Sequence, residues 1–165
     1  SRFMIGKRKT KIAKETVLAK NKYKMRNLSI IKAGGPIGTV GKLGEAISKI
    51  VNEMNVKINI IIMIDAALKL EGEKTGEIAE GAGAAIGGIG VERFKIEEIA
   101  TENNIPLHAI VIKQSNTEAI TSMKKEIAES ADEVEERVKR IIEEETKKGE
   151  NVLLVGVGNT IGVGQ

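Results

Sequence analysis

Residues 58–65, INIIIMID, decide how this chain folds. The stretch is almost entirely apolar and lacks the alternation of a strand with one wet face, so it is typical of a strand buried on both faces. The runs LHAIVIK at 107–113 and NVLLVGV at 151–157 have the same character. Parallel strands of this kind need long crossover connections, which are usually helices. The three runs therefore predict the centre of an α/β sheet.

The segments between and before these runs complete the prediction. Apolar residues recur at helical intervals from 43 to 54, from 91 to about 103 and from 117 to about 147, so each segment predicts a helix. Upstream, residues 14–24 and 28–33 are predicted to form two strands joined by a short turn. Strands that alternate with helices over these spacings indicate a single layered domain.

We expect one α/β domain over residues 1–165, arranged as a three-layer sandwich whose mostly parallel sheet carries an antiparallel N-terminal edge hairpin. Residues 1–13 show no clear pattern and are expected to be irregular. The stretch 66–90 contains seven glycines and is expected to form a loop between the central strand and the next helix.

The composition excludes several classes of protein. The chain has no Cys and a single His, His108, which excludes disulfide frameworks, thiolate metal sites and a Cys nucleophile. Because His108 lies inside a predicted strand, we interpret it as a core or interface residue and not as a catalyst. Aromatic residues make up 2% of the chain, which disfavours modules that stack nucleic-acid bases on exposed rings. No apolar run reaches the roughly 18–20 residues of a membrane span, and no secretory signal is recognisable, so we expect a cytoplasmic location.

Charge is distributed unevenly along the chain. Residues 1–32 contain 11 Lys or Arg and one acid, whereas the remainder has 15 basic and 22 acidic residues. Such a basic segment suits nucleic acid, an anionic surface or the acidic face of a second subunit, or it simply keeps an edge hairpin in solution. We therefore keep a homo-oligomer as one alternative and regard nucleic-acid binding as disfavoured.

A glycine-rich stretch, GGPIGTVGK at 34–42, follows a predicted strand and precedes a predicted helix. Backbone N–H groups in such a turn suit phosphate or carboxylate. The stretch is no P-loop, because Pro36 stands where G-x-x-x-x-G-K needs glycine and Leu43 replaces the Ser or Thr that would hold Mg²⁺. The alternatives are a tight turn or an anionic-ligand site formed by Gly34, Gly35 and Gly38.

Polar residues follow the ends of the predicted strands. Asp65 ends the first apolar run and Lys113 ends the second, so both are expected at the edge where ligands bind in open α/β sheets. Asp65, Lys69 and Lys113 are the predicted catalytic residues, and Asp65 is also the predicted ligand of a divalent metal. The alternatives are a helix cap for Asp65 and a solvated loop for the residues after it. The predicted ligand-binding residues of this edge are Glu71, Lys74, Glu77, Glu80, Ser115, Asn116 and Asn159.

Three strings resemble a known family. They are IDAALKLEGEKTGEIAEGAGAAIGGIGVERFKIEEIA at 64–100, NIPLHAIVIKQSNTEAITSMKKEI at 104–127 and VGVGNTIG at 155–162. The chain resembles, over residues 14–165, an archaeal family known as domain of unknown function 1512. The resemblance implies the C-terminal part of a longer protein and brings no established activity.

A more distant likeness concerns the hydrogenase-maturation and spore-germination protease superfamily. A buried strand ending in Asp-Ala, a glycine-rich stretch and the string VGVGN at 155–159 are similar to features of those proteases. On that analogy Asp65 matches a metal-ligand or catalytic acid. However, VGVGN stands near the end of this chain instead of its start, and His108 does not match their histidine. The analogy therefore implies architecture more than peptidase activity.

Three functions are consistent with the sequence. The first is an uncharacterised domain that binds a small-molecule or anionic ligand at the carboxyl ends of its strands. The second is a metal-dependent hydrolase or peptidase-like enzyme built on Asp65. The third is a non-catalytic, oligomeric interaction domain that relies on the uneven charge.

Overall fold

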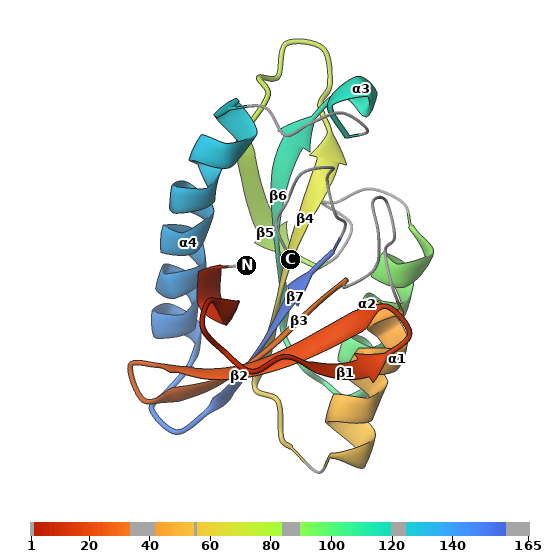
Figure 1. The fold of residues 1–165 in the computed structure, drawn as a ribbon, viewed down its shortest axis with the longest axis vertical. Coiled ribbons are helices and arrows are strands. Elements are labelled where there is room, and N and C mark those ends of the chain that lie inside the picture. Colours follow the sequence, from red (N-terminus) through yellow and green to blue (C-terminus); the bar gives the residue numbers. More distant parts are fainter. Residues whose placement is uncertain (1, 34–41, 55, 84–89, 120–124, 158–165) are drawn as a thin grey trace.

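In the computed structural model, the chain folds into a seven-stranded sheet with helices packed on it (Figure 1). The structure describes residues 2–33, 42–54, 56–83, 90–119 and 125–157. The strands are β1 (Thr10–Ala13), β2 (Thr16–Tyr23), β3 (Arg26–Ala33), β4 (Ile60–Leu68), β5 (Ile78–Ala82), β6 (Leu107–Gln114) and β7 (Asn151–Gly156). The helices are α1 (Leu43–Ser48), α2 (Val91–Glu102), α3 (Asn116–Ala119) and α4 (Lys125–Glu145), with a 3-10 turn η1 (Arg2–Met4) and a π-helical turn η2 (Lys49–Glu53). The α/β fold is therefore confirmed.

The strand order is β1-β2-β3-β7-β4-β6-β5, and the sheet is mixed. Strands β3, β7, β4 and β6 run parallel, whereas β1 and β5 extend the sheet antiparallel at its two edges. The expectation of a mostly parallel sheet is wrong, because the pairings of β1 with β2, β2 with β3 and β5 with β6 are antiparallel. Residues 78–82, expected to lie in a loop, form β5 beside β6. The predicted antiparallel hairpin is confirmed as β2 and β3. It is not the edge of the sheet, because β1 pairs with β2 outside it.

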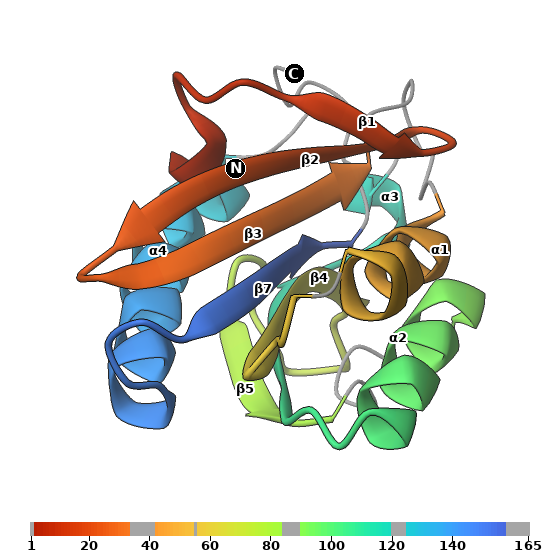
Figure 2. The same ribbon diagram turned by 90° about the horizontal axis from the view of Figure 1, so that it is seen from below.

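Apolar side chains cover both faces of the sheet. Consecutive residues of one strand enter different clusters, as Ile30 and Ile31 of β3 do. The cluster around Ile31 includes buried apolar residues of α1 and α2, and the cluster around Ile30 includes buried apolar residues of α4. Figure 2 shows α4 on one side of the strands and α1 with α2 on the other. We refer to these surfaces as the α2 face and the α4 face.

Helix α4 carries the apolar stripe that the sequence predicts. Its buried residues include Val134, Val138 and Ile141, which recur at intervals of three and four. The predicted helix from 117 to 147 is described as two pieces, α3 and α4, with residues 120–124 outside the described part of the chain. Within the described ranges, no helix combines the length and apolar character needed to cross a bilayer.

The basic N-terminal segment packs against α4. Residues 1–13, expected to be irregular, contain η1, whose Met4 is buried in the cluster on the α4 face, and the strand β1. Arg2 pairs with Asp132 of α4, and Lys24 pairs with Glu143 at an Nζ–Oε1 distance of 2.7 Å. Part of the positive charge of this segment is therefore matched inside the chain.

The helices that follow β4 and β6 pack on opposite faces of the sheet. After β4 the chain forms β5 and then α2, which packs on the α2 face, whereas after β6 it forms α3 and then α4, which packs on the α4 face. Because β4 and β6 are parallel neighbours, the winding of the chain reverses between them. In open α/β sheets such a reversal places a crevice at the carboxyl ends of the two strands.

Candidate functional site

Asp65 lies inside β4, three residues before the strand ends at Leu68. The prediction that it ends the strand is therefore wrong, although β4 pairs with β7 only as far as Ile64, the preceding residue. Asp65 shares its face with Ile61 and Met63, so its carboxylate points to the α2 face. It caps no helix, because Oδ1 accepts a hydrogen bond from the N–H of the next residue, Ala66, at 2.7 Å.

Arg93, in the first turn of α2, is the partner of Asp65. Its Nε donates to Asp65 Oδ2, and its Nη2 donates to the carbonyl of Ala66 at 2.8 Å. The side chain of Asp65 is 3% exposed and that of Arg93 is 18% exposed. The pair therefore fastens the start of α2 to the carboxyl half of β4 in a nearly dry environment.

Burial and the cation have opposite effects on Asp65. Burial raises the pKa of the Asp65 carboxyl above its ordinary value, and the hydrogen bond and charge of Arg93 pull it back only in part. A carboxyl in this situation holds a proton more readily than an exposed aspartate does. Perturbed carboxyls of this kind occur in active sites, and they occur in structural ion pairs as well.

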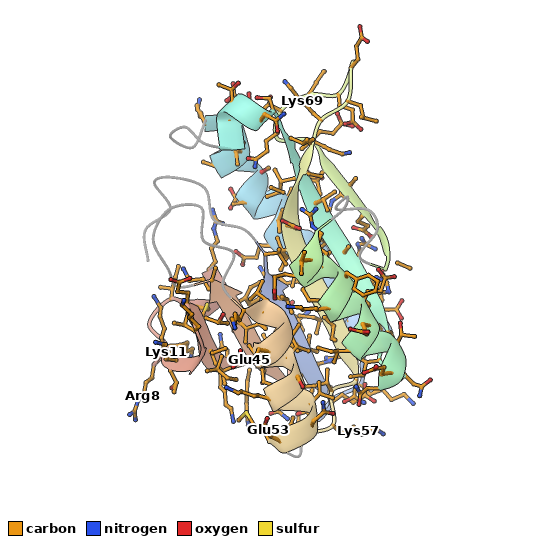
Figure 3. The ribbon with its side chains drawn as sticks, turned by 90° about the vertical axis from the view of Figure 1, so that its right-hand side faces the viewer. Arg8, Lys11, Glu45, Glu53, Lys57 and Lys69 are labelled. Carbon is orange, nitrogen blue, oxygen red and sulfur yellow. The ribbon has the colours of Figure 1, made fainter. Side chains whose placement is uncertain are left out.

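A second polar cluster lies where β4 and β6 end. Lys69 Nζ donates to Thr75 Oγ1 at 2.9 Å, and Thr75 Oγ1 donates to the buried carboxylate of Glu118 at 2.9 Å. Glu118 also accepts the N–H of Ser115 at 2.7 Å, while its own N–H donates to Ser115 Oγ at 3.2 Å. This reciprocal arrangement is a capping box at the start of α3. Figure 3 shows Lys69 at this end of the molecule.

Lys113 lies on the same face of the sheet as Asp65, two residues further along the neighbouring strand. The register pairs Asp65 with Val111 and Ala67 with Lys113. Lys113 Nζ lies 3.2 Å from Glu73 Oε1, with the two side chains 14% and 27% exposed. The loop between β4 and β5 is also bonded to the backbone of β6, because the N–H of Gly76 donates to the Lys113 carbonyl at 2.9 Å.

The three predicted catalytic residues therefore belong to neighbouring contacts and not to one shared centre. Asp65 is paired with Arg93, Lys69 bonds Thr75, and Lys113 pairs with Glu73. Of the predicted ligand-binding residues, Ser115 joins the Lys69 cluster, whereas Glu80 on β5 is turned to Arg137 and Arg140 of α4. The others are dispersed: Glu71 and Asn116 are exposed, and Glu77 accepts the N–H of Lys74. Gly34, Gly35, Gly38 and Asn159 lie outside the described residues.

The described residues offer limited means to hold a metal ion. Across ranges 2–33, 42–54, 56–83, 90–119 and 125–157, no group of three or more His, Asp or Glu side chains is arranged to hold one. Both oxygens of Asp65 are engaged, one by Ala66 and one by Arg93. A divalent metal at Asp65 would therefore have to replace the guanidinium.

Sequence reasoning missed several residues of these contacts, among them Arg93, Glu118 and Thr75. No feature of the sequence near Arg93 indicates its role, because that role depends on how α2 packs against β4. A local feature does indicate the role of Glu118, since Ser115 and Glu118 have the S-x-x-E spacing of a capping box at the start of a helix. Thr75 lies in a segment that its glycines indicated to be a loop, so its bond to Glu118 follows only from the fold.

The fold and these contacts define the class of protein: an α/β domain with a mixed sheet and a polar edge where its parallel strands end. A family model described as "Domain of unknown function (DUF1512) C-terminal" matches residues 1–164. The chain therefore belongs to this family. No curated protein and no solved structure matches it.

Proposed function

We propose that this domain binds a small polar ligand at the carboxyl ends of β4 and β6, on the α2 face of the sheet, and that Asp65 and Arg93 contact the ligand. The observation that carries the proposal is the position of this buried pair, beside the point where the winding of the chain reverses. The packing of α1 and α2 on one face and α4 on the other supports the proposed three-layer sandwich around that point.

The chemistry of the pair indicates the kind of ligand. A guanidinium presents a planar fork of donors that suits carboxylate and phosphate, and here it is held beside a carboxyl whose pKa is raised. Lys113 on the same face adds a second cation. An anionic group would interact with both cations, and an Asp65 that carries a proton would donate a hydrogen bond to it.

The test is a thermal-shift screen against small phosphates, nucleotides, carboxylic acids and divalent metals. We expect at least one anionic compound to raise the melting temperature of the wild-type chain and to lose this effect in Asp65→Asn and Arg93→Met. The matched control is Glu129→Gln, which makes the same carboxylate-to-amide change at an exposed pair with Lys125 on α4. A screen without hits, or a shift that survives in both site variants, would contradict the proposal.

A hydrolase or peptidase-like activity is the second candidate, favoured by the raised pKa of Asp65. A buried carboxyl with such a pKa is suited to transfer a proton in hydrolysis. This candidate predicts cleavage of model peptides or esters that is lost in Asp65→Asn and, for a metal enzyme, in EDTA. Equal cleavage by wild type and Asp65→Asn would exclude a catalytic role for this carboxyl.

Assembly of several copies through their uneven charge is the third candidate. Ion pairs within the chain count against it. Arg2 and Lys24 already pair with acids of α4, and Arg26 Nη2 donates to the Thr146 carbonyl at 2.8 Å. Fewer positive charges of the basic segment are therefore available to attract a second copy of the chain. Light scattering over a range of salt concentrations tests this proposal, which predicts association that weakens as salt rises. Archaeal origin and a cytoplasmic location remain proposals that rest on resemblance and composition.

A further inference from the structure

A single row of register-paired residues crosses the sheet on the α4 face. Lys11 of β1 pairs with Val17, Val17 with Lys32, Lys32 with Gly156 and Gly156 with Ile64. Residues paired across neighbouring strands point to the same face of a sheet. Val17 and Ile64 pack in the cluster of the α4 face, so Lys11 and Lys32 lie on that face as well.

Lys32 is a half-buried cation near the carboxyl end of β3. No described residue accepts a hydrogen bond from its Nζ or forms an ion pair with it. Burial lowers the pKa of the Lys32 ammonium, and the charge of Lys9 lowers it further. A partly desolvated ammonium beside a second cation is unfavourable in the isolated chain, and an anion that binds there would relieve both effects.

The neighbouring position in the row carries no side chain. Gly156 does not have a left-handed backbone, so its conformation does not require glycine. A Cβ added there would lie 3.4 Å from the Cβ of Lys32 and 3.7 Å from the carbonyl oxygen of Ile31, which is ordinary contact. Glycine at 156 therefore leaves a space on the sheet beside Lys32 that an alanine would occupy.

We propose that Lys32, with Lys9 near it and Lys11 two strands away in the same row, binds the phosphate group of a small molecule in the space over Gly156. Lysine ammonium groups act on phosphate as point charges, and a compact anion with more than one negative charge suits several lysines on one face. This site is distinct from the one around Asp65, because Asp65 lies on the α2 face and Lys32 on the α4 face. Figure 3 shows Lys11 far from Lys69, which marks the end of β4.

Calorimetric titration with pyrophosphate tests the proposal, with the ionic strength held constant by sodium chloride. We expect Lys32→Met to weaken binding by about tenfold or more. The matched control is Lys20→Met, which removes an exposed lysine from the opposite face of β2 and is expected to change the affinity by less than about twofold. Lys32→Met removes a half-buried charge and keeps the apolar stem, so the variant is expected to fold, as thermal unfolding will show.

A further variant tests the space beside Lys32. Gly156→Ala keeps every charge and fills the space, so it is expected to weaken pyrophosphate binding several-fold. The proposal is overturned if wild type does not bind, if Lys32→Met binds like wild type, or if Lys20→Met loses as much affinity. Full affinity in Gly156→Ala would equally overturn the site as placed here.

Discussion

Replacing Arg93 by methionine is expected to destabilise the fold far more than replacing Asp65 by asparagine. The Arg93→Met chain keeps a carboxylate that is 3% exposed and has lost its cation. Removing one partner of a fully buried ion pair costs about 3–5 kcal/mol. Because the Arg93 side chain is 18% exposed, water enters part of the site, and we expect a loss of about 2–3 kcal/mol near pH 7.

Asp65→Asn removes the buried charge itself. The amide oxygen still accepts the N–H of Ala66, and Arg93 still donates to the Ala66 carbonyl. The Arg93 guanidinium, which loses the carboxylate charge, is the more exposed member of the pair, so its desolvation penalty is smaller. We expect this variant to lose about 1 kcal/mol, the ordinary net contribution of a hydrogen bond.

The pH dependence separates the two variants. Burial raises the pKa of Asp65 in the folded chain above its ordinary value of 3.8, so the folded state binds this proton more tightly than the unfolded state. The stability contributed by this group is therefore fully present below about pH 4 and is lost as pH rises through the folded-state pKa. Arg93→Met removes the influence that lowers this pKa, so its loss of stability relative to wild type grows between pH 4 and 7. Asp65→Asn has no carboxyl to titrate and shows no such growth from this residue.

Urea unfolding followed by circular dichroism at several pH values between 4 and 7.5 measures these differences. Reporting each variant as its difference from wild type cancels the titration of the other carboxyls. The reasoning would be refuted by equal losses for Arg93→Met and Asp65→Asn at pH 7, or by an Arg93→Met loss that does not change with pH. The double variant should lose less than the sum of the single losses, because the two side chains are in contact.

Two further predictions concern the loop after β4 and the single tyrosine. Gly76→Ala should cost about 3 kcal/mol in urea unfolding, because φ is +83° and the new Cβ would lie 2.7 Å from the Glu126 carbonyl oxygen. The control Gly72→Ala, with φ of +89° and nothing within 4 Å, should cost about 1 kcal/mol, and equal losses would contradict the close contact. The hydrogen bond to Glu143 raises the pKa of Tyr23 above 10.0, so Glu143→Gln should lower it. Because the chain has no Trp and no other Tyr, phenolate absorbance reports this titration directly, and an unchanged curve would exclude the hydrogen bond.

The sequence predicts those strands and helices that are determined by their pattern of apolar residues alone. Strands β4, β6 and β7 are buried on both faces, so their runs need no alternation, and α4 carries a regular stripe. Strand β5 escapes prediction because its five residues, IAEGA, contain a glycine and a charged residue and have no apolar run. Its glutamate, Glu80, is held by arginines of α4 that lie about 60 residues further along the chain. Such a pairing has no local signal.

The same limit applies to the candidate site. The sequence places Asp65 and Lys113 near one edge of the sheet. The register shows that they lie on adjacent strands and that their side chains point to the same face of the sheet. The sequence does not show that β4 continues past Asp65, because an acidic residue after an apolar run usually marks the point where the chain reaches the surface. The strand continues because Arg93, 28 residues later, neutralises the carboxylate. Long-range partners of this kind decide which charged residues a strand tolerates.

The loop between β4 and β5 determines from which side a ligand would reach this edge. Lys69 N–H donates to the Gln114 carbonyl and Gly76 N–H to the Lys113 carbonyl, so both ends of the loop are fixed to the last residues of β6. Thr75 adds a side-chain bond to Glu118 at the start of α3. Because these described residues cover the end of β6, we expect a ligand to approach along β4 from the α2 face. That approach leads first to Arg93, the more exposed member of the pair, and only then to Asp65. Asp65 would therefore contact a ligand already held by the guanidinium, which is consistent with the expectation that either substitution abolishes the ligand response.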